Sequence, residues 1–211
     1  MRTKSYVQLL AVIGIAITAG MVMLAGCSPE RVSRDELVKY LQDKDHGLVH
    51  RTSVNGIGMR VSYQPRDLLI WQEVGESKAN ARVIDSVEKK YSNQEYFTMG
   101  LSRNNQEVIR QLGGFSQYSD MLQVLSFQMA DKVLLISDGR DTVASKDYVF
   151  QQTFGMGNEN SLLFVFDRAK LAEANEWTMY VKEFGLGLGI QKFVFRRSDV
   201  ERVPRLKELT D

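Results

Sequence analysis

The chain has 211 residues, of which 44% are hydrophobic and 25% are charged. These fractions are typical of a globular protein and exclude wholesale disorder and a polytopic membrane protein. Because 27 Lys and Arg residues balance 26 Asp and Glu residues, the chain lacks the basic surplus of a nucleic-acid binder, and we expect no such partner. A single cysteine excludes an intramolecular disulfide and a four-cysteine zinc site.

The N-terminus is the most informative segment. A short basic stretch (residues 1–5) precedes an uncharged, mostly apolar run (residues 6–24), and the tetrad Leu24-Ala25-Gly26-Cys27 ends it. A basic start, an apolar run and small residues before a cleavage point form a secretory signal. The residue after the small pair is the only cysteine in the chain, Cys27.

This pattern resembles the signal of bacterial lipoproteins, whose lipobox is a Leu-small-small-Cys tetrad. The resemblance covers residues 1–27 only. It implies cleavage between Gly26 and Cys27, a diacylglycerol on the Cys27 sulfur and an acyl group on the new amino group, with no other cofactor. It places the protein in the bacterial cell envelope, on the periplasmic or surface face, where Ser28 in place of an aspartate slightly favours the outer membrane over the inner. The alternative is an uncleaved anchor helix, since an apolar run of this length spans about 28 Å.

The remaining chain is predicted to be a short tether followed by one domain. Residues 27–32 form the lipidated cysteine and tether, residues 33–198 a single α+β domain, and residues 199–211 a polar, frayed tail interrupted by Pro204. Ser33 and Glu36 match a capping box, so a helix is expected to begin there and to stop at Gly47.

A β-hairpin is expected around Asn55-Gly56, which fits a two-residue type I′ turn between alternating segments. This turn pairs Val54 with Ile57 and, further along, Arg51 with Arg60. One face of the hairpin is mostly apolar and should meet the core, whereas both arginines lie on the other face.

The rest of the chain predicts a helical middle and a C-terminal antiparallel β-meander of about five strands. Together with the N-terminal helix and hairpin, this pattern defines the α+β fold class. The expected helices are 66–74, 78–91, 104–112 and 118–129. The expected strands are 95–101, 132–137, 142–154, 161–166, 177–184 and 190–196.

The facing arginines are the candidate site that we would test first. Like charges across a strand pair are destabilising unless something anionic compensates them. A carboxylate such as Asp67, Glu73 or Glu76 could pair with each arginine, or the side chains could face water. The functional alternative is that Arg51 and Arg60 contact an anion, either lipid headgroups or an acidic partner.

Other motifs favour structural interpretations, and no catalytic or metal-binding residue is assigned. His46 and His50 have a spacing that could suit a metal, but Gly47 lies between them and His50 points to the core face. The glycine-rich segment 185–189 lacks the sixth-position glycine of a dinucleotide fingerprint and reads as a turn. Ser86 and Lys89 match S-x-x-K without its partner motifs.

Two hypotheses for function follow from these observations. The first is a non-catalytic envelope lipoprotein that binds a protein partner, as an accessory part of an envelope assembly. The alternative is a periplasmic or surface lipoprotein that binds or hydrolyses cell-wall or carbohydrate material, with Trp71 and Trp177 as candidate pocket residues. The absence of recognisable catalytic motifs leans against an enzyme, although carboxylate-based sites leave little local signature.

Overall fold

The computed structural model describes residues 30–75 and 80–209 of the chain. The elements below all belong to one compact unit that begins at Arg31. Gly26, Cys27 and the predicted signal segment therefore lie outside the described residues.

The larger of two antiparallel sheets has the strand order β2-β3-β4-β9-β8, with the short strand β5 paired to the end of β4. It joins the predicted hairpin to strands from the last third of the chain. The bounds are β2 (Val49–Val54), β3 (Ile57–Gln64), β4 (Gln94–Arg103), β5 (Gln106–Glu107), β8 (Asp147–Gln151) and β9 (Asn160–Asp167).

The smaller sheet has the order β11-β10-β6-β7 and is also antiparallel. A third, two-stranded sheet pairs β1 with β12 in parallel, and thereby joins the two ends of the folded unit. The bounds are β1 (Arg31–Val32), β6 (Val133–Ser137), β7 (Asp141–Ala144), β10 (Glu176–Val181), β11 (Gln191–Arg196) and β12 (Arg205–Leu206).

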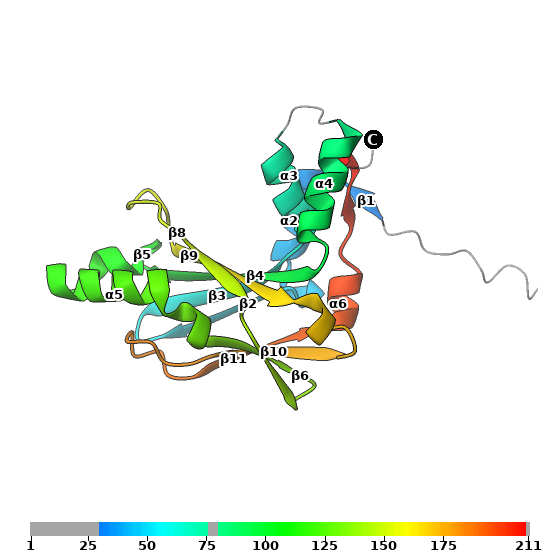
Figure 1. Ribbon diagram of the computed structural model, residues 1–211. Coiled ribbons are helices and arrows are strands. Elements are labelled where there is room, and N and C mark those ends of the chain that lie inside the picture. Colours follow the sequence, from blue (N-terminus) through cyan, green and yellow to red (C-terminus); the bar gives the residue numbers. More distant parts are fainter. Residues whose placement is uncertain (1–29, 76–79, 210–211) are drawn as a thin grey trace, which may run out of the picture. The chain divides into compact units, whose positions relative to one another are not determined.

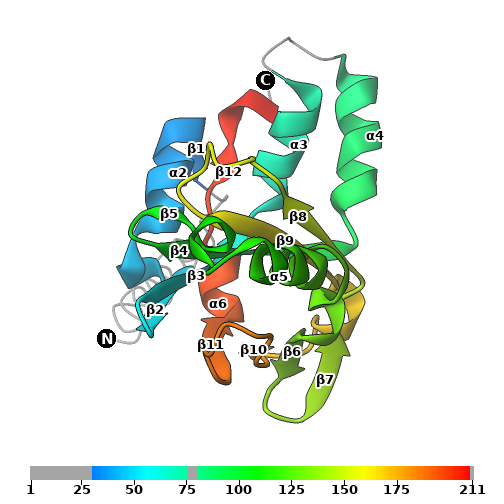
Figure 2. The ribbon, with the colours of Figure 1, turned by 90° about the vertical axis from the view of Figure 1, so that its left-hand side faces the viewer.

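Helices cover the larger sheet on the side away from the smaller sheet (Figure 1). There α2, α3 and α4 stand together, while α5 runs along one end of the unit and faces the viewer in Figure 2. The bounds are α2 (Arg34–Gln42), α3 (Arg66–Val74), α4 (Ala81–Tyr91), α5 (Phe115–Phe127) and α6 (Arg197–Glu201).

The main core lies between the two sheets. Alternate residues of each strand face inward, as the two-residue period of a strand requires. Phe97 of β4 is at its centre, with its ring centroid 5.0 Å from that of Phe195 and 6.3 Å from that of Trp177. Fully burying side chains of this size contributes about 2 to 3 kcal/mol each, so this packing holds the sheets together.

Several local predictions are confirmed. The Ser33–Glu36 capping box begins α2, with the Glu36 carboxylate accepting from the Ser33 N–H at 2.8 Å. The hairpin has the predicted register, including Val54 opposite Ile57 and Arg51 opposite Arg60. The α+β class is confirmed as well, with mixed helices and antiparallel strands in the C-terminal part.

The C-terminal strands are antiparallel but do not form one continuous meander. Four of them build the smaller sheet, whereas β8 and β9 extend the larger one. The predicted strand 142–154 is two strands, β7 and β8, because the chain crosses from one sheet to the other near Ser145. The expected helix 104–112 is instead β5 followed by a short 3-10 helix, Val108–Gln111.

The predicted frayed tail differs from the structure over its described residues. Residues 197–201 form α6, and Leu206 of β12 is fully buried. The Asp67 carboxylate on α3 accepts from the Arg205 guanidinium at 2.7 Å and from the Leu206 N–H at 3.1 Å. Because these contacts tie the segment to the body of the protein, the folded unit extends past residue 198.

Candidate functional site

A groove lies on the helix-covered face of the larger sheet, beside α2. Its volume is about 410 Å³, within the range of small-molecule sites. Outward-facing residues of β2, β3 and β4 form the floor, and α2 forms one wall. The polar side chains that matter below are Gln42, Arg51, Arg60, Gln64 and Glu159, and the apolar ones are Val38, Leu41, Val49 and Leu68.

The two predicted arginines both line this groove, but they differ in their partners. Arg60 pairs with Glu159, whose second carboxylate oxygen lies 3.4 Å from the Arg60 Nε. The Arg60 Nη1 also donates to the Ser62 hydroxyl at 2.7 Å. Arg51 is exposed and has no hydrogen bond or ion pair to any residue that the structure describes. The groove therefore carries one compensated and one uncompensated guanidinium.

The carboxylates considered from the sequence do not pair with these arginines. Asp67 binds Arg205, and Glu73 accepts from the ammonium of Lys90 at 2.7 Å. Glu76 lies outside the described residues. The residue that compensates Arg60 is Glu159, which is 99 positions away in sequence and which no local pattern singles out.

Gly100 explains how Glu159 reaches Arg60. Gly100 lies directly opposite Arg60 in the β3–β4 pair, and the Glu159 carboxylate crosses the sheet surface above it. A Cβ at position 100 would overlap that carboxylate. The ion pair therefore depends on a glycine at position 100, which leaves space for the Glu159 carboxylate.

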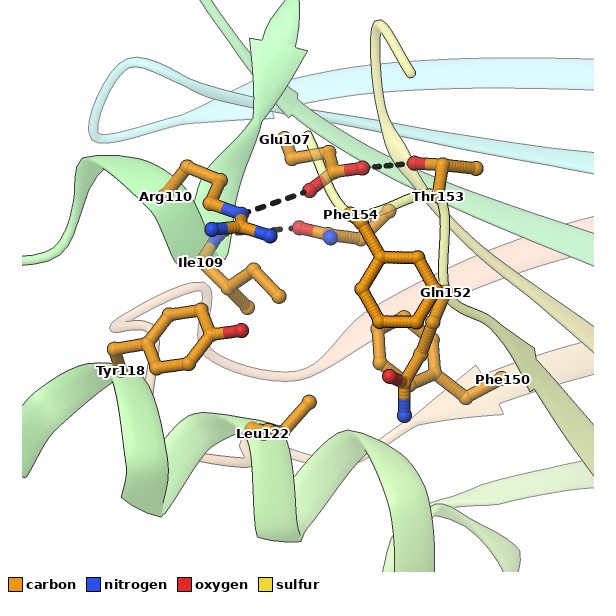
Figure 3. A pocket seen from close by; sticks show the side chains of 10 residues that line it. Glu107, Ile109, Arg110, Tyr118, Leu122, Phe150, Gln152, Thr153 and Phe154 are labelled. Atoms are coloured by element: carbon orange, nitrogen blue, oxygen red, sulfur yellow. Dashed lines mark hydrogen bonds and ion pairs between the residues drawn. The ribbon is translucent and has the colours of Figure 1, made fainter. Parts of the chain in front are cut away.

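A second, smaller site fixes the β8–β9 loop that carries Glu159 (Figure 3). The Glu107 carboxylate, only 3% exposed, accepts from the Thr153 hydroxyl and from the Gly155 N–H, the latter at 3.1 Å. Its other oxygen lies 3.5 Å from the Arg110 Nε. The cavity beside them is about 10 Å³, which is room for no more than one water, so Glu107 acts as a structural anchor.

The tip of the same loop presents two large apolar side chains to solvent. Phe154 is 72% exposed and Met156 is 86% exposed. Phe154 also has a φ of 54°, a left-handed backbone that costs about 1 to 2 kcal/mol in a residue other than glycine. The buried Glu107 holds the loop in this conformation.

The two histidines do not form a metal site. The His46 ring stacks on Tyr40 with centroids 3.7 Å apart, whereas His50 turns toward the core as predicted and contacts Phe195. Within residues 30–75 and 80–209, no cluster of three or more His, Cys, Asp or Glu side chains could hold a metal ion.

The backbone N–H groups of the glycine-rich segment 185–189 bind the carboxylate of a neighbouring residue, Glu183. The Glu183 carboxylate accepts from the N–H groups of Gly185 at 2.7 Å, Leu186 at 2.9 Å and Gly187 at 3.0 Å, and from that of Gly189 at 2.5 Å. Burial raises the pKa of Glu183, yet these four bonds outweigh it and the net pKa is lowered. The segment is a turn, as expected, with an internal counter-charge.

The remaining candidates from the sequence, Trp71, Trp177 and Ser86, lie outside the groove. Trp177 is buried and its indole N–H donates to the Leu171 carbonyl at 3.3 Å, while Trp71 packs under the Arg34 guanidinium at 4.4 Å. Ser86 is exposed on α4. Neither tryptophan lines the groove.

Across the described part of the chain, no helix has both the length and the hydropathy of a transmembrane span.

Comparisons with known proteins assign no family to the chain. No protein-family model matches the chain, and no curated protein matches it. A search of solved structures finds a novel protein of unknown function from Burkholderia pseudomallei K96243, which is 14% identical over 80% of this chain and 87% of that one. The TM-score is 0.40, too low for any structural or functional argument.

Proposed function

We propose that the protein is a lipid-anchored component of the bacterial cell envelope whose folded domain binds a protein partner without catalysis. The anchor rests on the tetrad Leu24-Ala25-Gly26-Cys27 after a basic and then apolar segment. Diacylglycerol on Cys27 and an acyl group on its amino nitrogen supply the two or more chains that stable anchoring needs. No other cofactor belongs to this proposal.

The short tether supports a position close to the membrane. Only residues 28–30 separate Cys27 from β1, so the lipidated residue lies within about 14 Å of Arg31 along an extended chain. Since β1 is paired to β12, Arg31 has a fixed place in the domain. The domain is thus held beside the headgroups, on the periplasmic or surface side, and we favour the outer membrane.

The observation that carries the binding role is Arg51, a cation in the groove that no carboxylate of the described residues neutralises. Most glycoside hydrolases use two carboxylates that flank the bond. The residues that line this groove supply a single one, Glu159, and it is engaged by Arg60. We therefore favour partner binding over the alternative of a carbohydrate hydrolase.

The test combines anchoring and partner capture in the native bacterium. Full-length protein is labelled with an alkyne-modified palmitate and crosslinked in intact envelopes, beside Cys27→Ala, Arg51→Ser and Arg82→Ser variants. We expect labelling that requires Cys27 and a near-stoichiometric crosslinked partner that is lost in Cys27→Ala and reduced in Arg51→Ser. Arg82, an exposed arginine of α4, is the matched control and should behave as wild type.

Two outcomes would contradict the proposal separately. A wild-type protein without lipid label would overturn the anchor. A labelled wild-type protein that captures nothing would overturn the partner-binding role and would direct work to soluble ligands and glycans.

A further inference from the structure

We infer that the groove beside α2 binds a peptide segment of the partner that carries a carboxylate next to an apolar side chain. This inference rests on the proposed function in one respect, namely that the partner is a protein. It adds the chemical class that the groove recognises and the residues that recognise it.

The charges in the groove are complementary to a single negative group. Arg51 faces Arg60 directly across the β2–β3 pair, and Glu159 neutralises only Arg60. The Ser62 hydroxyl, which accepts from Arg60, is 2.7 Å from the Thr98 hydroxyl, so this part of the floor is already hydrogen-bonded. The planar guanidinium of Arg51 remains and matches a carboxylate in a bidentate manner.

The same charges disfavour inorganic phosphate or a phosphate monoester. A phosphate near neutral pH carries up to two negative charges and is held by several cations or by converging backbone N–H groups. Arg51 is the one cation in the groove that no described residue neutralises, and the Glu159 carboxylate, which also lines the groove, repels a second negative charge. A monoanionic carboxylate is therefore the better complement.

The uncharged part of the groove suits a peptide backbone. Gln42 of α2 and Gln64 of β3 both line it, and neither amide has a side-chain hydrogen bond within the described part of the chain. A glutamine amide both donates and accepts, which matches the paired N–H and C=O groups of a peptide. Val38 and Leu41 add an apolar wall for a neighbouring side chain.

The test titrates full-length protein in detergent micelles with two capped peptides, acetyl-Val-Leu-Glu-Val-amide and acetyl-Val-Leu-Gln-Val-amide. Arginine Nε resonances report directly on Arg51. We expect the glutamate peptide to shift the Arg51 resonance saturably and to bind about tenfold more tightly than the glutamine peptide, because a hydrogen bond to a charged group is lost in the latter.

Variants localise the effect. Arg51→Ser should remove the preference for the glutamate peptide, whereas Arg82→Ser should keep it. Gln42→Ala combined with Gln64→Ala should lower the affinity for both peptides equally, by severalfold, because the backbone contacts are common to both. Arg51 is exposed and faces Arg60 across the strand pair, so its replacement should not lower the thermal unfolding midpoint.

Three results would overturn the inference. They are equal affinity for the two peptides, an unchanged preference in Arg51→Ser, and displacement of the glutamate peptide by inorganic phosphate, or by phosphatidylglycerol mixed into the micelles, at lower concentration than acetate. If envelope crosslinking still depends on Arg51 in that case, the proposed function stands and only the ligand class is wrong. If instead the peptide results hold and no partner is captured, the groove chemistry stands without the envelope role.

Discussion

The imidazole of His50 faces the space between the sheets, where it meets Phe195 edge-on with ring centroids 4.7 Å apart. Its Nε2 is buried and has no hydrogen-bond partner among the residues that the structure describes. Burial disfavours the charged ring and lowers the pKa of His50, although hydrogen bonds with the backbone of Val194 and Gly47 act in the opposite direction. The folded protein therefore binds this proton less readily than the unfolded chain does.

This lowered pKa predicts that stability falls as the pH drops below about 6.5, the ordinary pKa of histidine. Between the folded pKa and about 6.5, the unfolded chain binds a proton that the folded His50 ring does not bind. The free energy of unfolding therefore falls in this range and levels off below the folded pKa. Replacing His50 with Gln should remove this part of the pH dependence, which we expect to be under about 1 kcal/mol because the ring is partly screened by solvent. Urea unfolding at pH 7.5 and 5.5 measures it.

The control is His46→Gln, which removes the other histidine and should leave the His50 contribution intact. A wild-type and a His50→Gln protein that lose the same stability over this pH range would contradict the assignment.

At the scale of elements, the β8–β9 loop is held in a strained conformation. It carries Phe154 in a left-handed conformation, and Gly157 has no space for a Cβ beside Thr153. One buried carboxylate, Glu107, compensates by binding two donors of the loop and pairing with Arg110. The loop in turn places Glu159 over Gly100 in the groove.

Removing this anchor should therefore destabilise the loop measurably. Glu107→Ala leaves the Gly155 N–H and the Thr153 hydroxyl without their acceptor, and we expect a loss of about 2 to 3 kcal/mol in urea unfolding. Glu107→Gln keeps one acceptor oxygen and should lose about half of that. Equal losses in the two variants would show that the negative charge of Glu107, which pairs with Arg110, matters more than its hydrogen bonds to the loop.

The glycine-rich turn provides a second case in which a carboxylate organises a loop. Four backbone N–H groups converge on Glu183, and Asn55 at the hairpin tip donates to the Gly187 carbonyl at 2.8 Å. The turn therefore connects the tip of the β2–β3 hairpin to the segment between β10 and β11.

Hydrogen exchange should report this turn directly. In Glu183→Ala we expect the amides of segment 185–189 to exchange about tenfold faster, because their acceptor is gone. Acid should act in the same direction in the wild type. The lowered pKa means that the carboxylate stabilises the turn above about pH 4.5, and that this contribution is lost as the pH falls through the folded value. Glu201→Ala, which breaks an exposed pair with Arg197, is the control that should leave segment 185–189 unaffected.

At the scale of the whole molecule, the folded unit is closed by the pairing of its first strand with its last. Asp67 on α3 supports this closure, because its buried carboxylate binds both the Arg205 guanidinium and the Leu206 N–H. Leu206 is then placed in the core. A segment that looks polar in sequence is therefore part of the structural frame.

Arg205→Ala should leave the Asp67 charge buried with one remaining partner, and we expect it to lower the free energy of unfolding by about 2 to 3 kcal/mol. Adding Asp67→Asn removes the buried charge and should recover part of this loss. The double-mutant cycle, measured by urea unfolding, gives the coupling energy. A coupling near zero would mean that the pair contributes nothing to the closure.

The sequence predicts the elements whose determinants are local. The Asn55-Gly56 turn fixes the complete register of the hairpin, and Ser33 with Glu36 fixes the start of α2, because both signals act over a few residues. Sheet membership of β8 and β9 is not predicted, since it depends on pairing with distant strands.

The candidate site was predicted in part for the same reason. Arg51 and Arg60 follow from the hairpin register, but Glu159 reaches Arg60 through a glycine in a third strand and a loop anchored elsewhere. The β1–β12 pair involves two residues on each side, too few to show a periodic pattern. Such long-range partners leave no trace in a local window of sequence.

The pairing of β1 with β12 also sets the route by which mechanical load would enter the domain. If Cys27 is held in a membrane, any pull on the domain is transmitted through residues 28–30 to Arg31 and Val32. These two residues lie parallel to Arg205 and Leu206. Tension would thus pass directly into the last strand and, through Arg205 and Asp67, into α3. Without the β1–β12 pair, the same tension would act on the start of α2 alone. The helix would then unfold from its N-terminus, beginning with the capping box.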